Sequence, residues 1–462
     1  MRHAKFALAL LAAAALAGCG GGSSGGDQRP EVRYTAQVTF GDSLSDVGTY
    51  AVGAIAALGG GKYTINGDGT ATDAALTGKN WTELLAAQLG LPPPCAAQTG
   101  LTGDPSRGFL VAIKNDPTCF GYAQGGARVT HPIGPNNRLT GSALGQLTVP
   151  VVTQIANHLA VAGGSFSGTE LVNITAGGND VAMQLGMLSA AATAAGAAEG
   201  ARVGAQTFST VLIGLLAAGA TDPVAAAAAI GLALQTEAAR PGSTQTTQVA
   251  AAVAAAAVQP GNAAVASPAV YGPMVAKATS DATAAGNAAA ATAGAAYLAA
   301  NAPNAVAALA QAGAELVALV KTQVIAKGAN YVVVNNLGDF ANAPAGKAQL
   351  ATVNALIVQM VDAFNGALAT GLAGESKVLL IDLYAFSHDQ IVNPAPYGLS
   401  NTKDPACPQT PLGNSALGCT ITLLASGDAS HFMFADDRHP TPYEYRLIAQ
   451  YVAERMLIKG WL

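Results

Sequence analysis

Charged residues are scarce in this chain. Asp, Glu, Lys and Arg together make up 11% of the 462 residues, whereas soluble domains usually carry about 25%. The balance is slightly acidic, because 22 Lys and Arg stand against 27 Asp and Glu, which gives a formal net charge of −5. A protein that binds nucleic acid mainly through its charge carries a strongly basic surface. The composition therefore excludes that class, and we expect no nucleic-acid partner.

Aromatic residues and long apolar runs are also few. Aromatics account for 5% of the chain, although 51% of the residues are hydrophobic, and the excess is alanine. A membrane helix needs about 20 consecutive apolar residues. After the first 25 residues every apolar run is interrupted sooner, and the longest candidate, residues 211–220, ends at Thr221. The sequence therefore predicts no membrane-spanning segment beyond the N-terminus, and its length is sufficient for one or two hydrophobic cores.

The N-terminus has the features of an export signal. Arg2 and Lys5 precede an apolar run, and a Gly/Ser-rich stretch follows. We therefore predict a signal peptide over residues 1–18, which is excluded from the fold, and a flexible tether over residues 19–33.

Residues 16–19, Leu-Ala-Gly-Cys, resemble the lipobox of bacterial lipoproteins, in which the cysteine thiol is acylated and becomes the first mature residue. The resemblance implies a lipid anchor on Cys19. Because residue 20 is not aspartate, it also implies an outer-membrane lipoprotein, facing either the periplasm or the surface. The alternative is a secreted protein whose signal is cleaved near Gly18.

The other four cysteines are Cys95, Cys119, Cys407 and Cys419, and none of them belongs to a Cys-x-x-Cys pair. The chain also lacks a His-x-x-x-His spacing, so we expect no metal site. An even number of cysteines in an exported protein indicates disulfides. Of the three possible pairings, the simplest is Cys95–Cys119 with Cys407–Cys419.

Short apolar runs alternate with helical segments along much of the chain. The alternation of strand and helix is typical of a parallel α/β sheet. The predicted strands are residues 34–40, 171–175, 331–334 and 378–383. The predicted helices are residues 80–89, with a capping box at Asn80, 314–326 and 351–372.

Residues 181–313 differ from the rest, because they are rich in Ala, Gly and Thr and contain no strand pattern. Alanine has the highest helix propensity, so we predict helices, broken where Pro or Gly occurs. Apolar residues at helical spacing favour an ordered, inserted helical subdomain over a disordered cap. The expected breaks include Pro223, Pro241, Pro260 and Pro303.

Ser43 lies in the motif Gly41-Asp42-Ser43-Leu44, directly after the first predicted strand. A serine on a tight turn between a strand and a helix is accessible, as a nucleophile must be. Gly, Asp and Ser are also the commonest turn residues, so the motif alone leaves an ordinary turn as the alternative.

Asp436 and His439 form a second motif, followed by Thr441 and Pro442 at the start of the last helix. An Asp three residues before a His can hold one imidazole nitrogen while the other nitrogen faces a serine hydroxyl. A solvated surface loop is the alternative. Asn179, at the end of a predicted strand, and the Gly-rich residues 121–127 offer amide groups that are able to donate to an oxyanion.

Taken in order, Gly-Asp-Ser-Leu, Tyr-Ala-x-Gly-Gly-Ala, Gly-x-Asn-Asp and Asp-x-x-His resemble the four sequence blocks of the GDSL, or SGNH, hydrolases. The resemblance implies that Ser43 is the nucleophile, His439 the general base and acid, and Asp436 the residue that orients His439. It further implies an oxyanion hole made of the Ser43 backbone N–H, the Gly126 backbone N–H and the Asn179 side chain.

The chain departs from the family at Gly121, where relatives usually have Asn, and this leaves Gly125 as an alternative to Gly126. The resemblance covers roughly residues 34–180 and 314–457, with the Ala-rich segment outside it. It implies a flavodoxin-like three-layer α/β/α sandwich, the SGNH hydrolase fold, over residues 34–180 and 314–462. The inserted Ala-rich helical subdomain then occupies residues 181–313.

The implied activity is hydrolysis of short- to medium-chain carboxylic esters through an acyl-enzyme, with no cofactor. Three alternatives remain: a lipase or phospholipase whose insert acts as a lid, a polysaccharide O-deacetylase, and a surface lipoprotein that binds a ligand on an inactive scaffold. A further candidate triad, Ser387-His388-Asp389, is disfavoured because adjacent side chains point apart.

Overall fold

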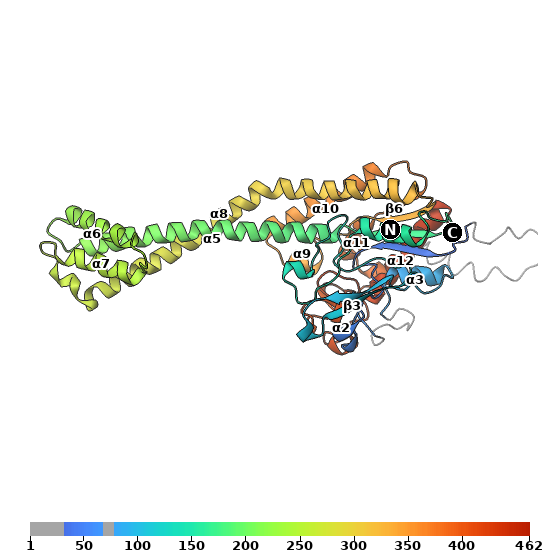
Figure 1. The fold of residues 1–462 in the computed structure, drawn as a ribbon, viewed down its shortest axis with the longest axis horizontal. Helices are drawn as coiled ribbons and strands as arrows, with labels where there is room; N and C mark the ends of the chain where they lie inside the picture. The colour runs from blue at the N-terminus through green and yellow to red at the C-terminus, as the bar shows by residue number, and fades with distance from the viewer. Residues whose placement is uncertain (1–31, 68–77) are drawn as a thin grey trace, which may run out of the picture. The chain divides into compact units, whose positions relative to one another are not determined.

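The computed structural model describes residues 32–67 and 78–462. The expected signal peptide, Cys19 and almost all of the expected tether lie outside these residues. The chain divides into two compact units (Figure 1). Unit 1 consists of Met1–Gln184 and Asn304–Leu462, and unit 2 of Leu185–Pro303.

A four-stranded parallel sheet in the order β1-β4-β5-β6 forms the centre of unit 1. β1 and β4 are buried along their whole length, as expected for a parallel sheet that is covered on both faces. The predicted α/β class with a parallel sheet is therefore confirmed. The strands are β1 (Gln37–Gly41), β4 (Leu171–Thr175), β5 (Tyr331–Asn335) and β6 (Val378–Ile381).

Helices pack on both faces of this sheet. On one face, Leu171 and Val333 join a buried cluster with Trp81 of α3 (Trp81–Gln88) and Tyr445 of α12 (Pro442–Lys459). On the other face, Phe40 contacts His158 of α4 (Val151–Val161). The layers are therefore helix, sheet and helix. α10 (Ala351–Gly371) agrees with its prediction to within one residue.

Two strand predictions had wrong ends: the strand expected at residues 34–40 is β1, which begins at Gln37, and another was too long. Residues 378–383 were expected to be extended, but β6 ends at Ile381 because Asp382 caps the next helix, α11 (Leu383–Val392). Its carboxylate accepts a hydrogen bond from the Ala385 N–H, which places Leu383 in the helix.

Several short elements surround the sheet, and the sequence analysis did not predict them. They include two further strand pairs, β2 with β3 and β7 with β8. The structure contains both expected disulfides, Cys95–Cys119 and Cys407–Cys419. The additional elements are α2 (Gly53–Ala57), β2 (Gln98–Thr102), β3 (Leu110–Asn115), α9 (Pro344–Lys347), β7 (Asn401–Pro405) and β8 (Phe432–Phe434).

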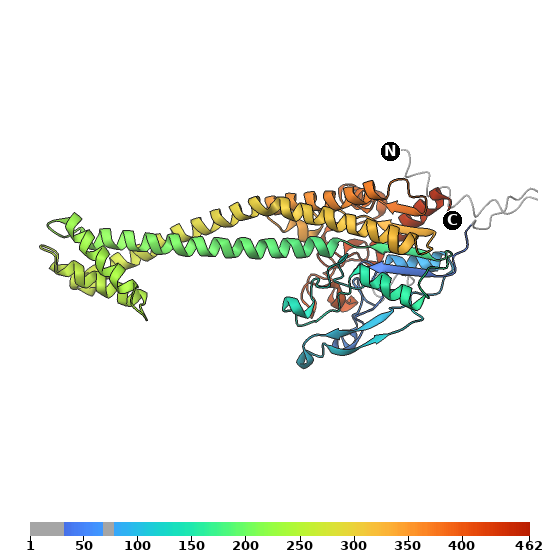
Figure 2. The same cartoon turned by 45° about the horizontal axis from the view of Figure 1, so that its top comes forward.

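Unit 2 is helical. α6 and α7 pack against each other (Figure 1, Figure 2), and Leu212, Leu216 and Ile230 lie in its buried cluster. A Cβ atom on Gly200 would lie 2.8 Å from the Gly286 carbonyl oxygen, so glycine allows the two long helices to approach closely there. The helices are α5 (Gly178–Ala217), α6 (Pro223–Ala238), α7 (Gln245–Ala257) and α8 (Pro268–Leu319), which continues into a π-helical turn, η5 (Val320–Ile325).

The expected helix break at Pro303 was wrong, because α8 runs through it and also through Pro273. A proline removes one backbone hydrogen bond and bends a helix without always ending it. Pro223 begins α6 as predicted, with Asp222 as the N-cap.

α5 and the combined helix Pro268–Ile325 are long and apolar enough to cross a membrane by length and composition alone. The most apolar 18-residue stretches of these two helices have mean hydropathies of 1.3 and 1.4. The sequence analysis expected no such segment, because it required an unbroken apolar run, whereas a mean hydropathy tolerates isolated polar residues. Helices of soluble proteins also pass this test.

Candidate active site

The backbone of Gly41 directs the chain away from the sheet just before Ser43. Its φ of +140° is rarely adopted by other residues, and a Cβ atom there would collide with the Thr175 carbonyl oxygen. The Gln154 side chain accepts a hydrogen bond from the Gly41 N–H at 2.7 Å and donates one to the Gly41 carbonyl at 2.8 Å. Gln154 therefore holds the end of β1 through both the N–H and the carbonyl of Gly41, and this determines the position of Ser43.

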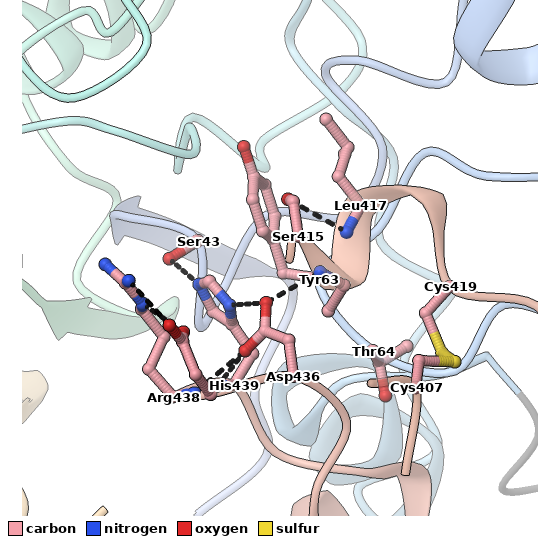
Figure 3. A network of polar contacts seen from close by, with 12 residues as sticks. Ser43, Tyr63, Thr64, Cys407, Ser415, Leu417, Cys419, Asp436, Arg438 and His439 are labelled. Carbon is pink, nitrogen blue, oxygen red and sulfur yellow. Dashed lines mark hydrogen bonds and ion pairs between the residues drawn. A yellow bond between two sulfur atoms is a disulfide. The ribbon is translucent and has the colours of Figure 1, made fainter. Parts of the chain in front are cut away.

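Ser43, His439 and Asp436 form a continuous hydrogen-bonded chain (Figure 3). The His439 Nε2 atom lies 2.9 Å from the Ser43 Oγ atom, and its Nδ1 atom lies 2.7 Å from Asp436 Oδ2. Ser43 and His439 are separated by 396 positions in the sequence. The fold thus brings together the three residues that the sequence analysis assigned to catalysis.

Asp436 is buried and remains a carboxylate because many donors surround it. Burial by itself raises the pKa of this group, but the His439 imidazole and the N–H groups of His439 and Ala416 outweigh burial and lower the pKa below 3.8. An ionised carboxylate at this place favours the tautomer with the proton on Nδ1, which leaves Nε2 facing the Ser43 hydroxyl.

α12 holds the other side of the His439 turn. The Thr441 Oγ1 atom caps the helix by accepting the Glu444 N–H at 3.2 Å, and Pro442 occupies the first turn, as predicted. The Thr441 hydroxyl donates to the Phe432 carbonyl at 2.6 Å. His439 therefore sits between the end of β8 and the start of a helix.

The two adjacent glycines of the second block have different hydrogen-bonding states. The Gly125 N–H donates to Asp46 Oδ2 at 2.9 Å. In the described part of the chain, neither the Gly126 N–H nor the Ser43 N–H donates a hydrogen bond to another protein group. These observations favour Gly126 over Gly125 as an oxyanion donor.

Asn179 lies at the start of α5, and its Nδ2 atom donates to the Ala127 carbonyl at 2.8 Å. An amide nitrogen carries two hydrogens, so this contact orients the side chain and leaves one N–H for another acceptor. The neighbouring Asp180 binds Arg128 at 2.8 Å and accepts the Val129 N–H. The start of α5, which carries Asn179, is thereby joined to the residues that follow the Gly-rich loop.

Two acidic residues near Ser43 are buried: Asp42, inside the Gly-Asp-Ser-Leu motif, and Asp46, two residues after it. Burial raises the pKa of Asp42 to about 7, an effect partly opposed by the Leu44 N–H and the His439 imidazole. Burial also raises the pKa of Asp46, whose carboxylate accepts the N–H groups of Gly48, Thr49 and Gly125. Asp46 therefore connects the serine turn to the glycine loop.

Tyr63 contributes to the site and was missed by the sequence analysis. Its ring lies 4.8 Å from the His439 ring, centroid to centroid, and its hydroxyl accepts the Gln146 Nε2 at 2.6 Å. A Cβ atom on Gly125 would collide with the Tyr63 hydroxyl. No sequence motif identifies Tyr63. Asp46 is easier to suspect from the sequence, because it lies only three residues after Ser43.

The alternative triad Ser387-His388-Asp389 is not assembled. His388 Nδ1 lies 2.7 Å from Asp339 Oδ2, the Ser387 hydroxyl donates to the Leu383 carbonyl, and Asp389 accepts from Tyr397. Within residues 32–67 and 78–462, no group of three or more His, Cys, Asp or Glu side chains is arranged to hold a metal ion.

The model of the family described as GDSL-like lipase/acylhydrolase matches residues 192–452, which is 261 of the 462 residues. The chain therefore belongs to this family. The matched range includes Asp436 and His439 and begins after Ser43 and Asn179. It also includes most of the Ala-rich segment, which corrects the expectation that residues 181–313 lie outside the resemblance.

Two curated proteins match shorter stretches. The chain is 36% identical over 75 residues to Lipase 1 of Photorhabdus luminescens, covering 16% of this chain and 11% of that protein. It is 32% identical over 97 residues to a GDSL esterase/lipase of Arabidopsis thaliana, covering 20% of this chain and 24% of the relative. The matches thus span about a tenth and a quarter of the relatives' lengths.

Proposed function

We propose that this protein is a serine hydrolase that cleaves carboxylic esters, with short- to medium-chain acyl groups as its substrates. The observation that carries the proposal is the hydrogen-bonded chain from the Ser43 hydroxyl through His439 to the buried Asp436. A serine hydroxyl becomes an effective nucleophile when an oriented imidazole accepts its proton. Membership of a lipase/acylhydrolase family supports the same reaction class.

In the proposed mechanism, Ser43 Oγ attacks the ester carbonyl while His439 Nε2 takes the hydroxyl proton. The N–H groups of Ser43 and Gly126 and the Asn179 amide donate to the oxyanion of the tetrahedral intermediate. When the intermediate collapses, His439 returns the proton to the departing alcohol and an acyl-enzyme remains on Ser43. Water then attacks the acyl group with His439 as general base, which releases the acid and restores the serine.

Labelling with a fluorophosphonate, combined with hydrolysis of p-nitrophenyl butyrate, tests this proposal. We expect the probe to label Ser43 and the Ser43→Ala variant to lose both labelling and hydrolysis. Ser387→Ala is the matched control, because Ser387 precedes His388 directly in the sequence but its hydroxyl donates to a backbone carbonyl and not to an imidazole. Full activity in Ser43→Ala would contradict the proposal.

A lipid ester is a second candidate substrate, and the surface of unit 2 favours it. Val224, Leu232 and Val258 are 82%, 66% and 79% exposed, and residues 241–276 contain no charged side chain. Exposed apolar groups on a surface with few charges suit contact with a lipid phase. On this proposal, residues 181–313 are an inserted helical subdomain that contacts the substrate interface.

Comparing monomeric with emulsified esters of increasing chain length tests the lipid candidate. We expect activity on long-chain esters to rise when an interface forms, and to rise less in a variant with Val224, Leu232 and Val258 all replaced by Ser. Ala225, Ala228 and Ala254, each replaced by Ser, form the matched control, because these residues are also exposed in unit 2. Equal activity with and without an interface favours a soluble ester.

We also propose that the protein is exported and held at the outer membrane through a lipid on Cys19. The two disulfides support export, because disulfides persist in oxidising compartments. Metabolic labelling with a tagged fatty acid should mark the native chain and not the Cys19→Ser variant. No labelling of the native chain would favour the secreted alternative, and labelling of the variant would mean that the lipid is attached at another residue.

A further inference from the structure

The Asp436 carboxylate accepts four hydrogen bonds, and one of them differs in origin from the others. The Arg438 N–H, the His439 N–H and the His439 Nδ1 atom bind it at 2.9, 2.7 and 2.7 Å, and all three belong to the same short turn as Asp436. The fourth donor is the Ala416 N–H, 2.6 Å from Oδ2. Ala416 is thus the donor that ties this turn to a separate segment.

Ala416 lies in the loop closed by the Cys407–Cys419 disulfide, whose two cysteines are 12 positions apart (Figure 3). The Cys407 N–H donates to the carbonyl of Ala435, the residue before Asp436. Cys419 follows Ala416 by three positions. The disulfide therefore joins a residue that is hydrogen-bonded to Ala435, next to Asp436, with a residue close to Ala416, and it limits the separation of Asp436 and its fourth donor.

This arrangement is buried. Ala416, Cys407, Cys419 and Ala435 belong to one hydrophobic cluster and are almost fully inaccessible. The Asn66 side chain donates to the Ala416 and Cys419 carbonyls at 3.2 and 3.0 Å, which holds the same turn from the other side. Water therefore does not readily replace the Ala416 N–H as a donor to Asp436.

We propose that the Cys407–Cys419 loop is a positioning element of the active site, which acts through the Ala416 N–H on Asp436 and through Asp436 on His439. The inference rests on the proposed function. Oδ2 receives both the Ala416 N–H and His439 Nδ1, so the first contact fixes the rotation of the carboxylate and the second transmits it to the imidazole. Without the loop, the carboxylate turns more freely and His439 Nε2 spends less time at 2.9 Å from the Ser43 hydroxyl.

Paired disulfide variants provide the first test. In Cys407→Ser/Cys419→Ser we expect kcat on p-nitrophenyl butyrate to fall about 10- to 100-fold while KM changes by less than about twofold, because orientation and not binding is lost. Cys95→Ser/Cys119→Ser is the matched control, since the backbone hydrogen bonds of these cysteines go to Gly121 and Asp116 and not to the Asp436 turn. We expect it to keep kcat per folded molecule, as determined by active-site titration.

Ala416 itself provides the second test. Ala416→Pro replaces the N–H by a Cδ atom, which displaces Asp436 Oδ2 from its place 2.6 Å from the nitrogen. The backbone itself is compatible with proline, because Ala416 is the first residue of a 3-10 turn (Ala416–Gly418) and Ser415 is extended, with φ −105° and ψ 126°. We expect kcat to fall as in the disulfide variant. Ala416→Gly keeps the N–H and should keep kcat.

A spectroscopic readout separates this inference from the proposed function. A histidine Nδ1–H that donates to a carboxylate gives a far-downfield proton signal, which does not depend on turnover. We expect the signal of His439 in the native protein and in both controls, and its loss or broadening in Cys407→Ser/Cys419→Ser. An unchanged signal and kcat in that variant, or an equal loss in Cys95→Ser/Cys119→Ser, would overturn the inference, whereas a normal signal without any ester hydrolysis would refute the proposed function alone.

Discussion

Unit 1 contains two Asp–His pairs with the same geometry and different surroundings. Asp436 with His439 and Asp339 with His388 both have Nδ1–Oδ2 distances of 2.7 Å and buried carboxylates. The His439 side chain is 11% exposed and its Nε2 faces Ser43, whereas the His388 side chain is 49% exposed and stacks on Tyr384. An oriented imidazole is therefore not sufficient for this chemistry, because a hydroxyl and oxyanion donors must also lie beside it.

The largest expected difference between the two pairs concerns the imidazoles. His439→Ala should reduce kcat by about six orders of magnitude, because serine then lacks a general base. His388→Ala should leave kcat within about twofold. Steady-state hydrolysis of p-nitrophenyl butyrate measures both. A large loss in His388→Ala would mean that the second pair takes part in the reaction.

The carboxylates should differ in the same direction. Asp436→Asn is expected to lower kcat by about 10⁴-fold, because the amide favours the wrong imidazole tautomer. Asp339→Asn should affect stability and not kcat, since Asp339 also accepts from the Asn342 backbone and side chain. Thermal unfolding measured beside kcat separates the two effects.

The next difference between the two Asp–His pairs concerns the asparagine beside each of them. Asn179→Ala should lower kcat by about 100- to 1000-fold, the usual effect of removing one such donor. Asn342→Ala, at the second pair, should not change kcat. If Asn179→Ala keeps its activity, the Asn179 amide has only a structural role, as a hydrogen-bond donor to the Ala127 carbonyl.

The last difference concerns stability and not kcat, and it arises from Asp42, an additional carboxyl group close to the first pair. Burial raises its pKa from 3.8 to about 7, so the native state binds a proton that the unfolded state releases. Its contribution to stability is complete below pH 4 and is lost as the pH rises through 7. Between these values, the unfolding free energy of the native chain should therefore fall relative to Asp42→Asn by about 4 kcal/mol, because each pKa unit corresponds to about 1.4 kcal/mol. Urea unfolding at several pH values measures this difference, and parallel curves would contradict it.

The sequence was sufficient for the parts of the fold that repeat a simple pattern. The strand at residues 171–175 and the helix at 351–372 follow from apolar periodicity, and the capping box at Asn80 is formed as expected. The spatial meeting of Ser43 and His439 was expected from ordered motifs and not from periodicity. Local patterns report local structure, so they identify strands and caps well.

Contacts between distant segments were not predictable in the same way. Asp339 and His388 are 49 positions apart and belong to no shared motif. Ala416 acts through its backbone N–H, which every residue except proline possesses, so its side chain carries no signal. Tyr63 resembles any other core tyrosine until its position against His439 is known. These roles arise from tertiary packing.

The 396 positions between Ser43 and His439 affect how the protein is made. The hydroxyl is synthesised early and its base late, so a growing chain contains a serine without the group that activates it. On the proposed mechanism, Ser43 gains its base only after the final helix has docked on the sheet, and we expect a chain cut anywhere before residue 439 to be inert toward esters.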